Sequence, residues 1–201
     1  MLFPKSLQNL IESFKKLPGI GEKTAERLAF SVLNFSDYDI SEFGESILNL
    51  KKNISNCSIC GSLTDEDVCN ICNDKTRNTN TLLVVKDVKD VFVFEKMGTF
   101  NCLYHVLGGL ISPIDEIGPE DLKISSLISR INENQIDEVI LAINSGVEAD
   151  MTALYIKKVL SKYSVSVTRI ASGIPIGADM DYIDSLTLES ALNNRKEVLD
   201  N

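Results

Sequence analysis

The first fifty residues repeat apolar positions with the period of an α-helix. A stripe with spacings of three and four predicts a helix over residues 5–17, formed by Leu7, Leu10, Ile11, Phe14 and Leu17. Pro18 and Gly19 are expected to end this helix. A second helix is predicted after Gly21, with one face made of Ala25, Leu28, Ala29, Val32 and Leu33. A third is expected over residues 40–52, with Asp39 as its N-cap and an apolar face of Ile40, Phe43, Ile47 and Leu50.

The pattern changes after Thr81, where short apolar runs alternate with helical stretches. Runs typical of strands occur at 81–86, 102–107, 138–143 and 166–171. Helical patterns occupy residues 87–97 and lie near 120–133 and 149–163. Strands that alternate with helices predict a mostly parallel sheet covered on both faces. We therefore expect an α/β fold behind an N-terminal helical module, with functional groups gathered at the carboxyl ends of the strands.

Four cysteines between these two parts form two C-x2-C pairs separated by eight residues, namely Cys57, Cys60, Cys69 and Cys72. Two such pairs can complete a tetrahedral Zn²⁺ site, whereas four unrelated free or disulfide-bonded cysteines would not explain the paired spacing. The surrounding segment is short and polar, so the metal would supply its folding free energy. Because all four ligands are sulfur, we predict one structural zinc ion per chain. Cys102 lies in an apolar run and is expected to be buried.

The 201-residue chain has a formal net charge of −9, and this charge is unevenly placed. Residues 1–56 hold seven Lys/Arg and seven Asp/Glu, whereas residues 57–201 hold 13 Lys/Arg and 22 Asp/Glu, which accounts for the whole −9. A neutral part joined to an acidic part suggests two surfaces with different partners. The sequence shows neither a signal peptide nor an apolar run of about 18 residues, and thiolate ligands need a reducing compartment. We therefore expect a cytoplasmic protein without a membrane span.

The join between the first two helices, LPGIGEKTAERLAF, is a candidate nucleic-acid contact. Gly19 and Gly21 permit a tight turn, whose backbone N–H groups and those of the following helix would be free to bind a phosphate. Lys23 and Arg27 are four residues apart, so both can reach along one DNA backbone. An ordinary helical hairpin with a glycine turn is the alternative. A nucleotide P-loop is excluded, because that motif needs Gly directly before Lys, where this chain has Glu22.

Glu148 and Asp150 follow the predicted strand at 138–143 and form an acid-x-acid pair. Such pairs often hold Mg²⁺, but acids are also favoured at the start of a solvated helix. His105 is expected to be a hydrogen-bonded core residue, because no nucleophile pattern surrounds it. The acids of residues 172–188 either face a partner or belong to an ordinary surface loop.

Taken in order, these parts resemble the RecR family of bacterial recombination mediators. In that family a helix-hairpin-helix, a four-cysteine zinc element and a Toprim-like α/β domain follow one another. The resemblance spans about Leu7 to Arg195 and rests on the cysteine spacing and on LPGIGEKTAERLAF, YHVLGGLISPIDEIGPEDL, TALYI and GIPIGADMDYID followed by TL. It implies a DNA-binding module over 1–56, a zinc element over 57–79, a Toprim-like domain over 80–173 and a loop and helix over 174–201.

The resemblance also implies a non-enzymatic clamp. RecR-like proteins assemble as dimers and ring-like tetramers that encircle DNA, and they act with RecO and RecF proteins to help load RecA onto single-stranded DNA coated by SSB. It implies sequence-independent contact with single- and double-stranded DNA through the hairpin residues Gly19, Gly21, Lys23 and Arg27. Glu148 and Asp150 are then expected to form an interface for a protein partner such as RecO.

The chain departs from catalytic Toprim domains at two places. Topoisomerase and primase Toprim domains carry a Glu on the first strand, but here Lys86 occupies that position and its charge would repel Mg²⁺. Ser145-Gly146 also replaces the usual Pro-Thr before the acid pair. We expect Lys86 to lie near the pair and to keep both carboxylates ionised. These departures argue against a Mg²⁺-dependent nuclease or topoisomerase-like enzyme, which is the alternative function. A scaffold that binds only protein is a third hypothesis.

Overall fold

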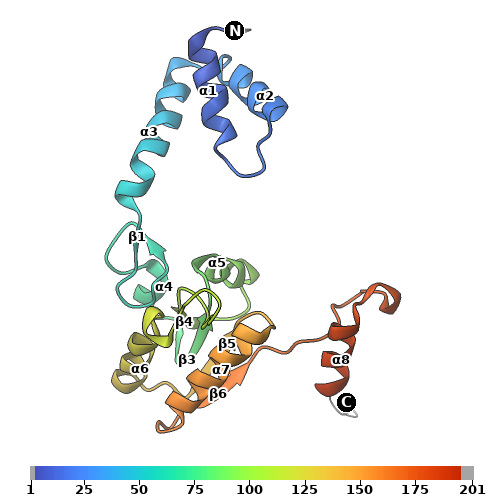
Figure 1. Ribbon diagram of the computed structural model, residues 1–201. Helices are drawn as coiled ribbons and strands as arrows, with labels where there is room; N and C mark the ends of the chain where they lie inside the picture. Colours follow the sequence, from blue (N-terminus) through green and yellow to red (C-terminus); the bar gives the residue numbers. More distant parts are fainter. Residues whose placement is uncertain (1–2, 196–201) are drawn as a thin grey trace. The chain divides into compact units, whose positions relative to one another are not determined.

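The computed structural model describes residues 3–195 of the chain (Figure 1). The chain divides into two compact units, Met1–Ile54 and Ser55–Asn201, which we call the N-terminal and C-terminal units. The last six residues of the predicted segment 174–201 lie outside the described residues. Within residues 3–195, no helix is both long enough and apolar enough to span a bilayer.

Three helices build the N-terminal unit, as the apolar periodicity predicts. They are α1 (Lys5–Lys15), α2 (Glu22–Val32) and α3 (Asp37–Asn53). The first two pack around Ile11, Ala25 and Ala29, and the two alanines allow the helices to approach closely. Ile20 from the connecting turn packs against this small core, so it fills the space between the helices.

The start of α3 differs from the prediction, because Ser36 and not Asp39 is the N-cap. The Ser36 Oγ accepts a hydrogen bond from the Asp39 backbone N–H at 3.2 Å, and Asp39 Oδ2 accepts one from the Ser36 N–H at 3.3 Å. This reciprocal pair is a capping box, with an acid three residues after the cap. Two free backbone donors are satisfied at once, so the helix begins three residues earlier than predicted.

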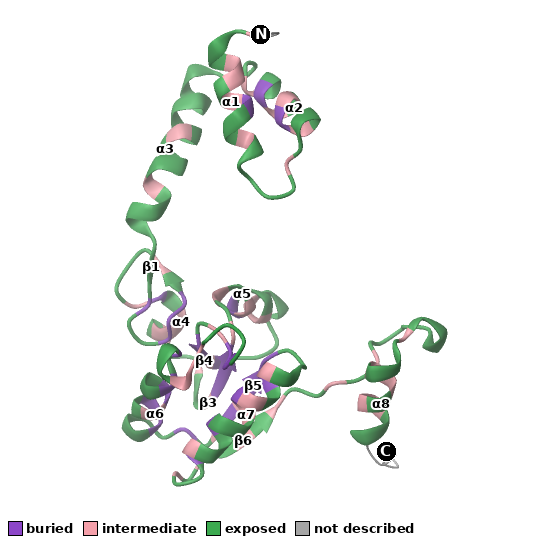
Figure 2. Cartoon of the chain, viewed as in Figure 1, coloured by how far each residue is buried: buried purple, intermediate pink, exposed green. Residues whose placement is uncertain are grey.

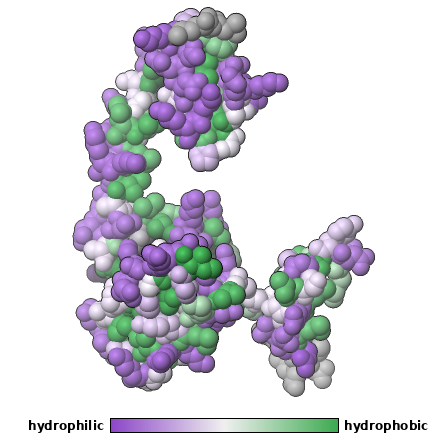
Figure 3. Space-filling model, viewed as in Figure 1, coloured by the Kyte–Doolittle hydropathy of each residue, from purple (hydrophilic) through white to green (hydrophobic). Residues whose placement is uncertain are grey.

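Every side chain of α3 is exposed or half-buried (Figure 2). Its predicted apolar face is at the surface of the chain, with Ile47 60% and Leu50 57% exposed. Ile40 and Phe43 from the same face are 44% and 42% exposed. Apolar surface is accordingly visible along α3 in the space-filling view (Figure 3). The stripe that predicts this helix therefore has no covering element among the described residues of the N-terminal unit.

The C-terminal unit contains the predicted α/β fold. Its four strands are all parallel and lie in the order β4-β3-β5-β6: β3 (Asn78–Val85), β4 (Cys102–Val106), β5 (Glu138–Ala142) and β6 (Ser166–Arg169). The three principal helices are α5 (Val88–Met97), α6 (Ile124–Glu133) and α7 (Val147–Leu160). The remaining elements are β1 (Ser55–Asn56), β2 (Leu63–Thr64), α4 (Asn70–Asn73), η1 (Pro119–Asp121), η2 (Met180–Tyr182) and α8 (Ser185–Asn193).

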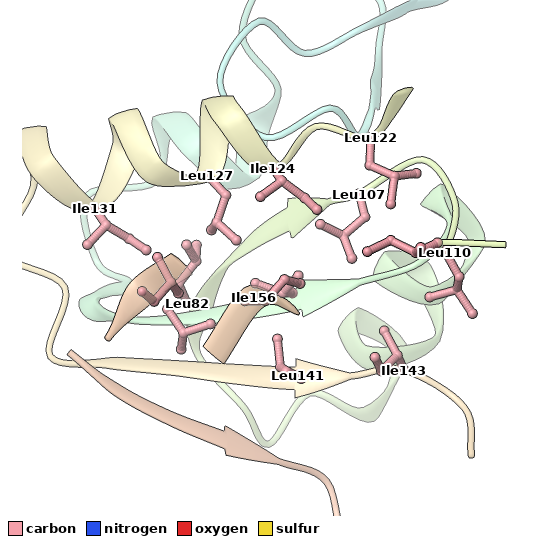
Figure 4. Packing of buried hydrophobic residues seen from close by; sticks show 14 of the residues in the cluster. Leu82, Leu107, Leu110, Leu122, Ile124, Leu127, Ile131, Leu141, Ile143 and Ile156 are labelled. Atoms are coloured by element: carbon pink, nitrogen blue, oxygen red, sulfur yellow. The ribbon is translucent and has the colours of Figure 1, made fainter. Parts of the chain in front are cut away.

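Alternate residues of the central strand enter two different cores. Leu82 and Val84 of β3 pack with residues of α6 and α7, such as Leu127 and Ile156 (Figure 4). Leu83 and Val85 point to the opposite face and join Val91 of α5. A strand buried on both faces must be apolar at every position, which explains the continuous run of large aliphatic residues in β3.

The outer edge of β4 is closed by groups from elsewhere in the unit. Arg77 Nη1 donates to the Cys102 carbonyl at 3.0 Å, and Arg130 Nη1 donates to the Tyr104 carbonyl at 2.5 Å. The Val106 N–H donates to the Cys60 carbonyl at 2.8 Å. Two side chains and one backbone carbonyl thus satisfy a strand edge that would otherwise be open to further pairing.

His105 and Cys102 of β4 are buried, as predicted. The His105 Nε2 bonds the Lys123 carbonyl at 2.8 Å, so the ring donates from this nitrogen. Burial lowers the pKa of His105 to about 4 and raises that of Cys102 to about 11. Both groups are therefore neutral near pH 7 and belong to the core rather than to a reactive site.

Candidate metal centre and nucleic-acid interface

The first cysteine pair lies in a tight turn after β1. The Gly61 N–H donates to the Cys57 carbonyl at 2.9 Å, and Gly61 has a left-handed φ of +78°. A methyl group at Gly61 would lie 2.8 Å from Lys123 Nζ and 3.4 Å from Val106 Cβ. Glycine is thus favoured by the left-handed backbone conformation, whereas the contact with Lys123 could be relieved by movement of that flexible side chain.

The four cysteine sulfurs converge on one point. The Sγ atoms of Cys57, Cys60, Cys69 and Cys72 all lie within 4.8 Å of one another, and none of these residues is in a disulfide. The Cys60 and Cys69 Sγ atoms are 3.6 Å apart. Zinc–sulfur bonds of about 2.3 Å in a tetrahedron place neighbouring sulfurs roughly 3.8 Å apart. The cluster therefore has the donor set and spacing of a closed, four-coordinate zinc site.

The pKa values of Cys60, Cys69 and Cys72 are shifted as expected for closely spaced thiols that have no cation between them. A hydrogen bond from Cys72 lowers the pKa of Cys60 to about 5, so Cys60 ionises first. The same bond raises the pKa of Cys72, and burial raises that of Cys69 to about 11. A second thiolate is thus disfavoured beside the first unless a divalent cation is present. Bound zinc would remove this penalty, because coordinated thiols are deprotonated.

The turn between α1 and α2 leaves its backbone open to solvent. Gly19 has a φ of +81°, and a methyl group at Gly19 or Gly21 would meet no atom within 4 Å. The first backbone N–H of α2 bonded within the helix belongs to Ala25, which donates to the Gly21 carbonyl. No side chain caps this end of α2, so the preceding N–H groups point to solvent.

Two cations follow this open turn on α2. The side chains of Lys23 and Arg27 are exposed, and neither forms an ion pair within residues 3–195. Glu22 is the acid of the first turn. Free N–H groups beside two unpaired cations can bind the phosphates of a nucleic-acid backbone without selecting a base sequence.

Glu148 and Asp150 both lie in the first turn of α7, but they face different neighbours. Glu148 Oε1 accepts a hydrogen bond from the buried Ser112 Oγ at 2.6 Å. Asp150 Oδ1 pairs with Arg169 Nη1 of β6 at 2.5 Å. Residues two apart on a helix point in different directions. The acid-x-acid spacing therefore places the two carboxylates in separate environments instead of one metal site.

Lys86 forms no ion pair with Glu148 or Asp150 within residues 3–195. Its Nζ lies 3.8 Å from Asp87 Oδ2, which is its ion pair within the described chain. The cation beside Asp150 is Arg169, which also donates from Nη2 to the Asn144 carbonyl at 3.0 Å. Sequence reasoning missed both Ser112 and Arg169, because their contacts with α7 span 36 and 19 residues.

An apolar pocket lies beside Glu148. Its volume is about 530 Å³, and it is bounded by the loop after β4 and by the start of α7. Ile114 and Val147 on its rim are 92% and 77% exposed. The lining residues are Leu110, Pro113, Ile114, Asn144, Ser145, Gly146, Val147, Glu148, Ala149 and Met151. Glu148 is the only charged residue among them, so the pocket combines apolar surface with one negative charge.

Replacing Cys60 by Ser should release the metal, because three thiolates and a neutral hydroxyl hold zinc far more weakly than four thiolates. Elemental analysis of the purified protein should give about one zinc per chain, falling well below half in the variant. Cys102→Ser is the matched control and should keep its zinc, since Cys102 lies outside the cluster. A wild-type protein with less than half a zinc per chain would contradict this assignment.

Comparison with protein-family models accounts for these parts in the same order along the chain. Residues 7–50 match the model for the RecR helix-hairpin-helix, and residues 54–74 match that for the RecR zinc finger domain with four cysteine ligands. Residues 80–171 match the Toprim domain model, and residues 173–196 match that for the RecR C-terminal segment. The sulfur cluster is accordingly the site of one structural zinc ion. With three RecR models and a Toprim model matched in order, the chain belongs to the RecR family and has a role in recombinational DNA repair.

Proposed function

We propose that this protein is a DNA-binding recombination mediator that performs no bond-making step. Several copies form a ring-like clamp on DNA, and the clamp helps RecO- and RecF-type partners to load RecA onto single-stranded DNA coated by SSB. The observation that carries the proposal is the open turn of the N-terminal unit, with its free N–H groups and the unpaired cations Lys23 and Arg27. In this proposal, residues 1–56 contact DNA and the Toprim-like residues 80–173 bind the protein partner.

The hairpin supports contact with DNA of any sequence. Its donors are backbone N–H groups and two flexible cations, and these recognise phosphate rather than base edges. The turn is accessible, because nothing lies within 4 Å of the Cβ positions of Gly19 and Gly21. Single and double strands both present such phosphates, so the same surface serves both.

The uncovered face of α3 supports assembly of several copies. Ile40, Phe43, Ile47 and Leu50 recur at helical spacing and are all more than 40% exposed. A 17-residue helix with no buried side chain gains little from its own chain, since helices in proteins are stabilised mainly by packing of an apolar face. A second copy of the same chain would cover this face and build a closed assembly.

The pocket beside Glu148 supports an interface for a protein partner. A basic partner could place an apolar side chain in the 530 Å³ pocket and a cation against Glu148. Asp150 contributes less net charge to this surface, because Arg169 already neutralises it. We therefore assign the electrostatic part of the interface mainly to Glu148, and Asp150 to holding the start of α7 against β6.

The separation of the two acids also supports a mediator over the nuclease alternative. A Toprim metal site needs several carboxylates around one Mg²⁺ ion. Here Glu148 bonds Ser112, Asp150 bonds Arg169, and Lys86 stands where the first-strand Glu would be. Each contact would have to break before these groups could share an ion.

Reversing the charge of both Lys23 and Arg27 to Glu should abolish binding to duplex and single-stranded DNA alike. Replacing only Lys23 by Gln should leave binding that can be measured, and removing this one phosphate contact should reduce the slope of log K against log salt by about 1 for duplex DNA. Fluorescence anisotropy over a range of salt concentrations measures both effects. Both side chains are exposed, so the fold should be unchanged by circular dichroism. Unaltered affinity in the doubly reversed protein would refute the assignment of the hairpin to DNA.

Replacing Ile47 by Glu should dissociate the assembly, because a carboxylate would be buried without a partner in the contact between copies. Light scattering coupled to size exclusion should show a smaller mass than for the wild type. Ser41→Glu is the matched control, since it adds the same charge on the opposite side of α3 and should leave the mass unchanged. Equal masses for wild type and Ile47→Glu would show that this face is not the contact.

Glu148→Gln should weaken binding to a purified RecO-type partner, while DNA binding through the hairpin persists. The loss should shrink at high salt, because screened charges contribute less to the wild-type affinity. Asp150→Asn is the matched comparison and should weaken binding less, given its existing pair with Arg169. Mg²⁺-dependent DNA cleavage that disappears in the Glu148→Gln, Asp150→Asn protein would instead establish the nuclease alternative.

A further inference from the structure

The four zinc ligands are not equally protected. Cys57, Cys60 and Cys69 are 3%, 1% and 4% exposed, whereas Cys72 on the short helix α4 is only partly buried. Cys72 also borders a cavity whose volume is about 600 Å³, and the other three ligands are not part of the lining of that cavity. A small molecule in the cavity therefore meets the residue Cys72 before the other three ligands.

Hydrogen bonding divides the four ligands into two pairs. The Cys57 Sγ accepts from the Cys69 N–H at 3.3 Å, and the Cys60 Sγ accepts from the Ser62 N–H at 3.4 Å. Within residues 3–195, no backbone N–H donates to the Sγ of Cys69 or Cys72. An N–H donor withdraws electron density from a thiolate, so the sulfurs of Cys69 and Cys72 are the more nucleophilic pair. Cys72 is the more exposed of these two.

The cavity beside Cys72 has a polar lining suited to a small polar oxidant. It lies between the zinc element, the start of β3 and α6, with hydroxyls from Ser58, Ser126 and Ser129. Arg130 in its wall is 7% exposed and forms no ion pair with a described acid. Lys75 adds a second cation, while Asp74 and Glu133 are the acids that also line the space.

We propose that Cys72 is the modification site through which peroxides and thiol-reactive electrophiles open the zinc element. The thiolate attacks one peroxide oxygen, the O–O bond breaks, and the second oxygen leaves as hydroxide that takes a proton to form water. This leaves a sulfenic acid on Cys72. The thiolate of Cys60, whose Sγ lies within 4.8 Å of that of Cys72, then displaces the sulfenic hydroxyl as hydroxide, which takes a proton to form a second water, and the two sulfurs form a disulfide. Two electrons pass from the two sulfurs to peroxide, and zinc loses two of its four ligands.

Loss of zinc after modification of Cys72 would affect the rest of the C-terminal unit through the contacts between the zinc element and the sheet. The Cys60 carbonyl accepts the Val106 N–H at the end of β4, at 2.8 Å. Ile71, the residue before Cys72, packs against the core on the α5 side of the sheet. A disulfide that moves Cys60 or Cys72 would loosen both contacts, so oxidation of one sulfur would weaken one edge of the Toprim-like sheet.

The zinc-loaded full-length chain tests this directly. Limiting hydrogen peroxide, and separately limiting N-ethylmaleimide, are added in the presence of a chromogenic zinc chelator, and peptides are mapped by mass spectrometry at early times. We expect the first N-ethylmaleimide adduct on Cys72, with zinc released at the same rate, and a Cys60–Cys72 disulfide after peroxide. Cys102 is an internal control and should stay unmodified, since it is 2% exposed. First modification at Cys57, Cys60 or Cys69 would overturn the proposal.

A pair of variants on α6 tests whether the cavity is the route. Ser129→Trp would fill the cavity without touching a ligand, and it should slow zinc release at least about five-fold. Asn132→Trp is the matched control, because Asn132 is exposed on the same helix but does not line the cavity. Both variants must first show one zinc per chain. Equal release rates in Ser129→Trp, Asn132→Trp and wild type would rule the cavity out as the route.

Discussion

The C-terminal unit depends on the attachment of the zinc element to the end of β4. The element has almost no apolar core apart from its cysteines, so the metal supplies its folding free energy. Its Cys60 carbonyl bonds the Val106 N–H, and Arg77, three residues after Asp74 at the end of α4, bonds the Cys102 carbonyl. Zinc binding therefore orders one of the groups that close the β4 edge, the Cys60 carbonyl. The metal stabilises a sheet that it does not touch.

Features that depend on spacing within a few residues could be predicted from the sequence, whereas contacts between distant segments could not. The cysteine cluster, the three N-terminal helices and the alternation of strands and helices all follow from spacing within a few residues. The contacts of the acid pair do not, because Arg169 and Ser112 come from distant segments whose position only the folded sheet decides. Lys86 was expected near the acids, and its ion pair is with its neighbour Asp87. The cap of α3 could have been predicted, since Ser36 precedes Asp39 by the three residues of a capping box.

The apolar face of α3 would be stabilised by burial, but its side chains are not buried in the described chain. Its capping box and the lysines of its last turn stabilise the helix ends, but neither buries the four large side chains of the stripe. Exposed apolar patches of this kind on a folded protein mark interaction surfaces. Local signals thus specify that α3 forms, whereas its stabilisation by packing would come from the assembly that we propose.

The proposed assembly holds together several chains that each contact DNA weakly. Such an assembly would reconcile DNA binding with a net charge of −9. Lys23 and Arg27, the two cations that follow the open turn, displace few counterions, so a single hairpin is expected to bind DNA weakly and with a shallow salt dependence. When several hairpins are held in one proposed ring, each bound copy raises the effective concentration of the others near the same DNA. Affinity then grows with the number of copies and not with the charge of any one of them. The acidic excess of residues 57–201 can therefore be kept for a basic protein partner without a cost to DNA binding.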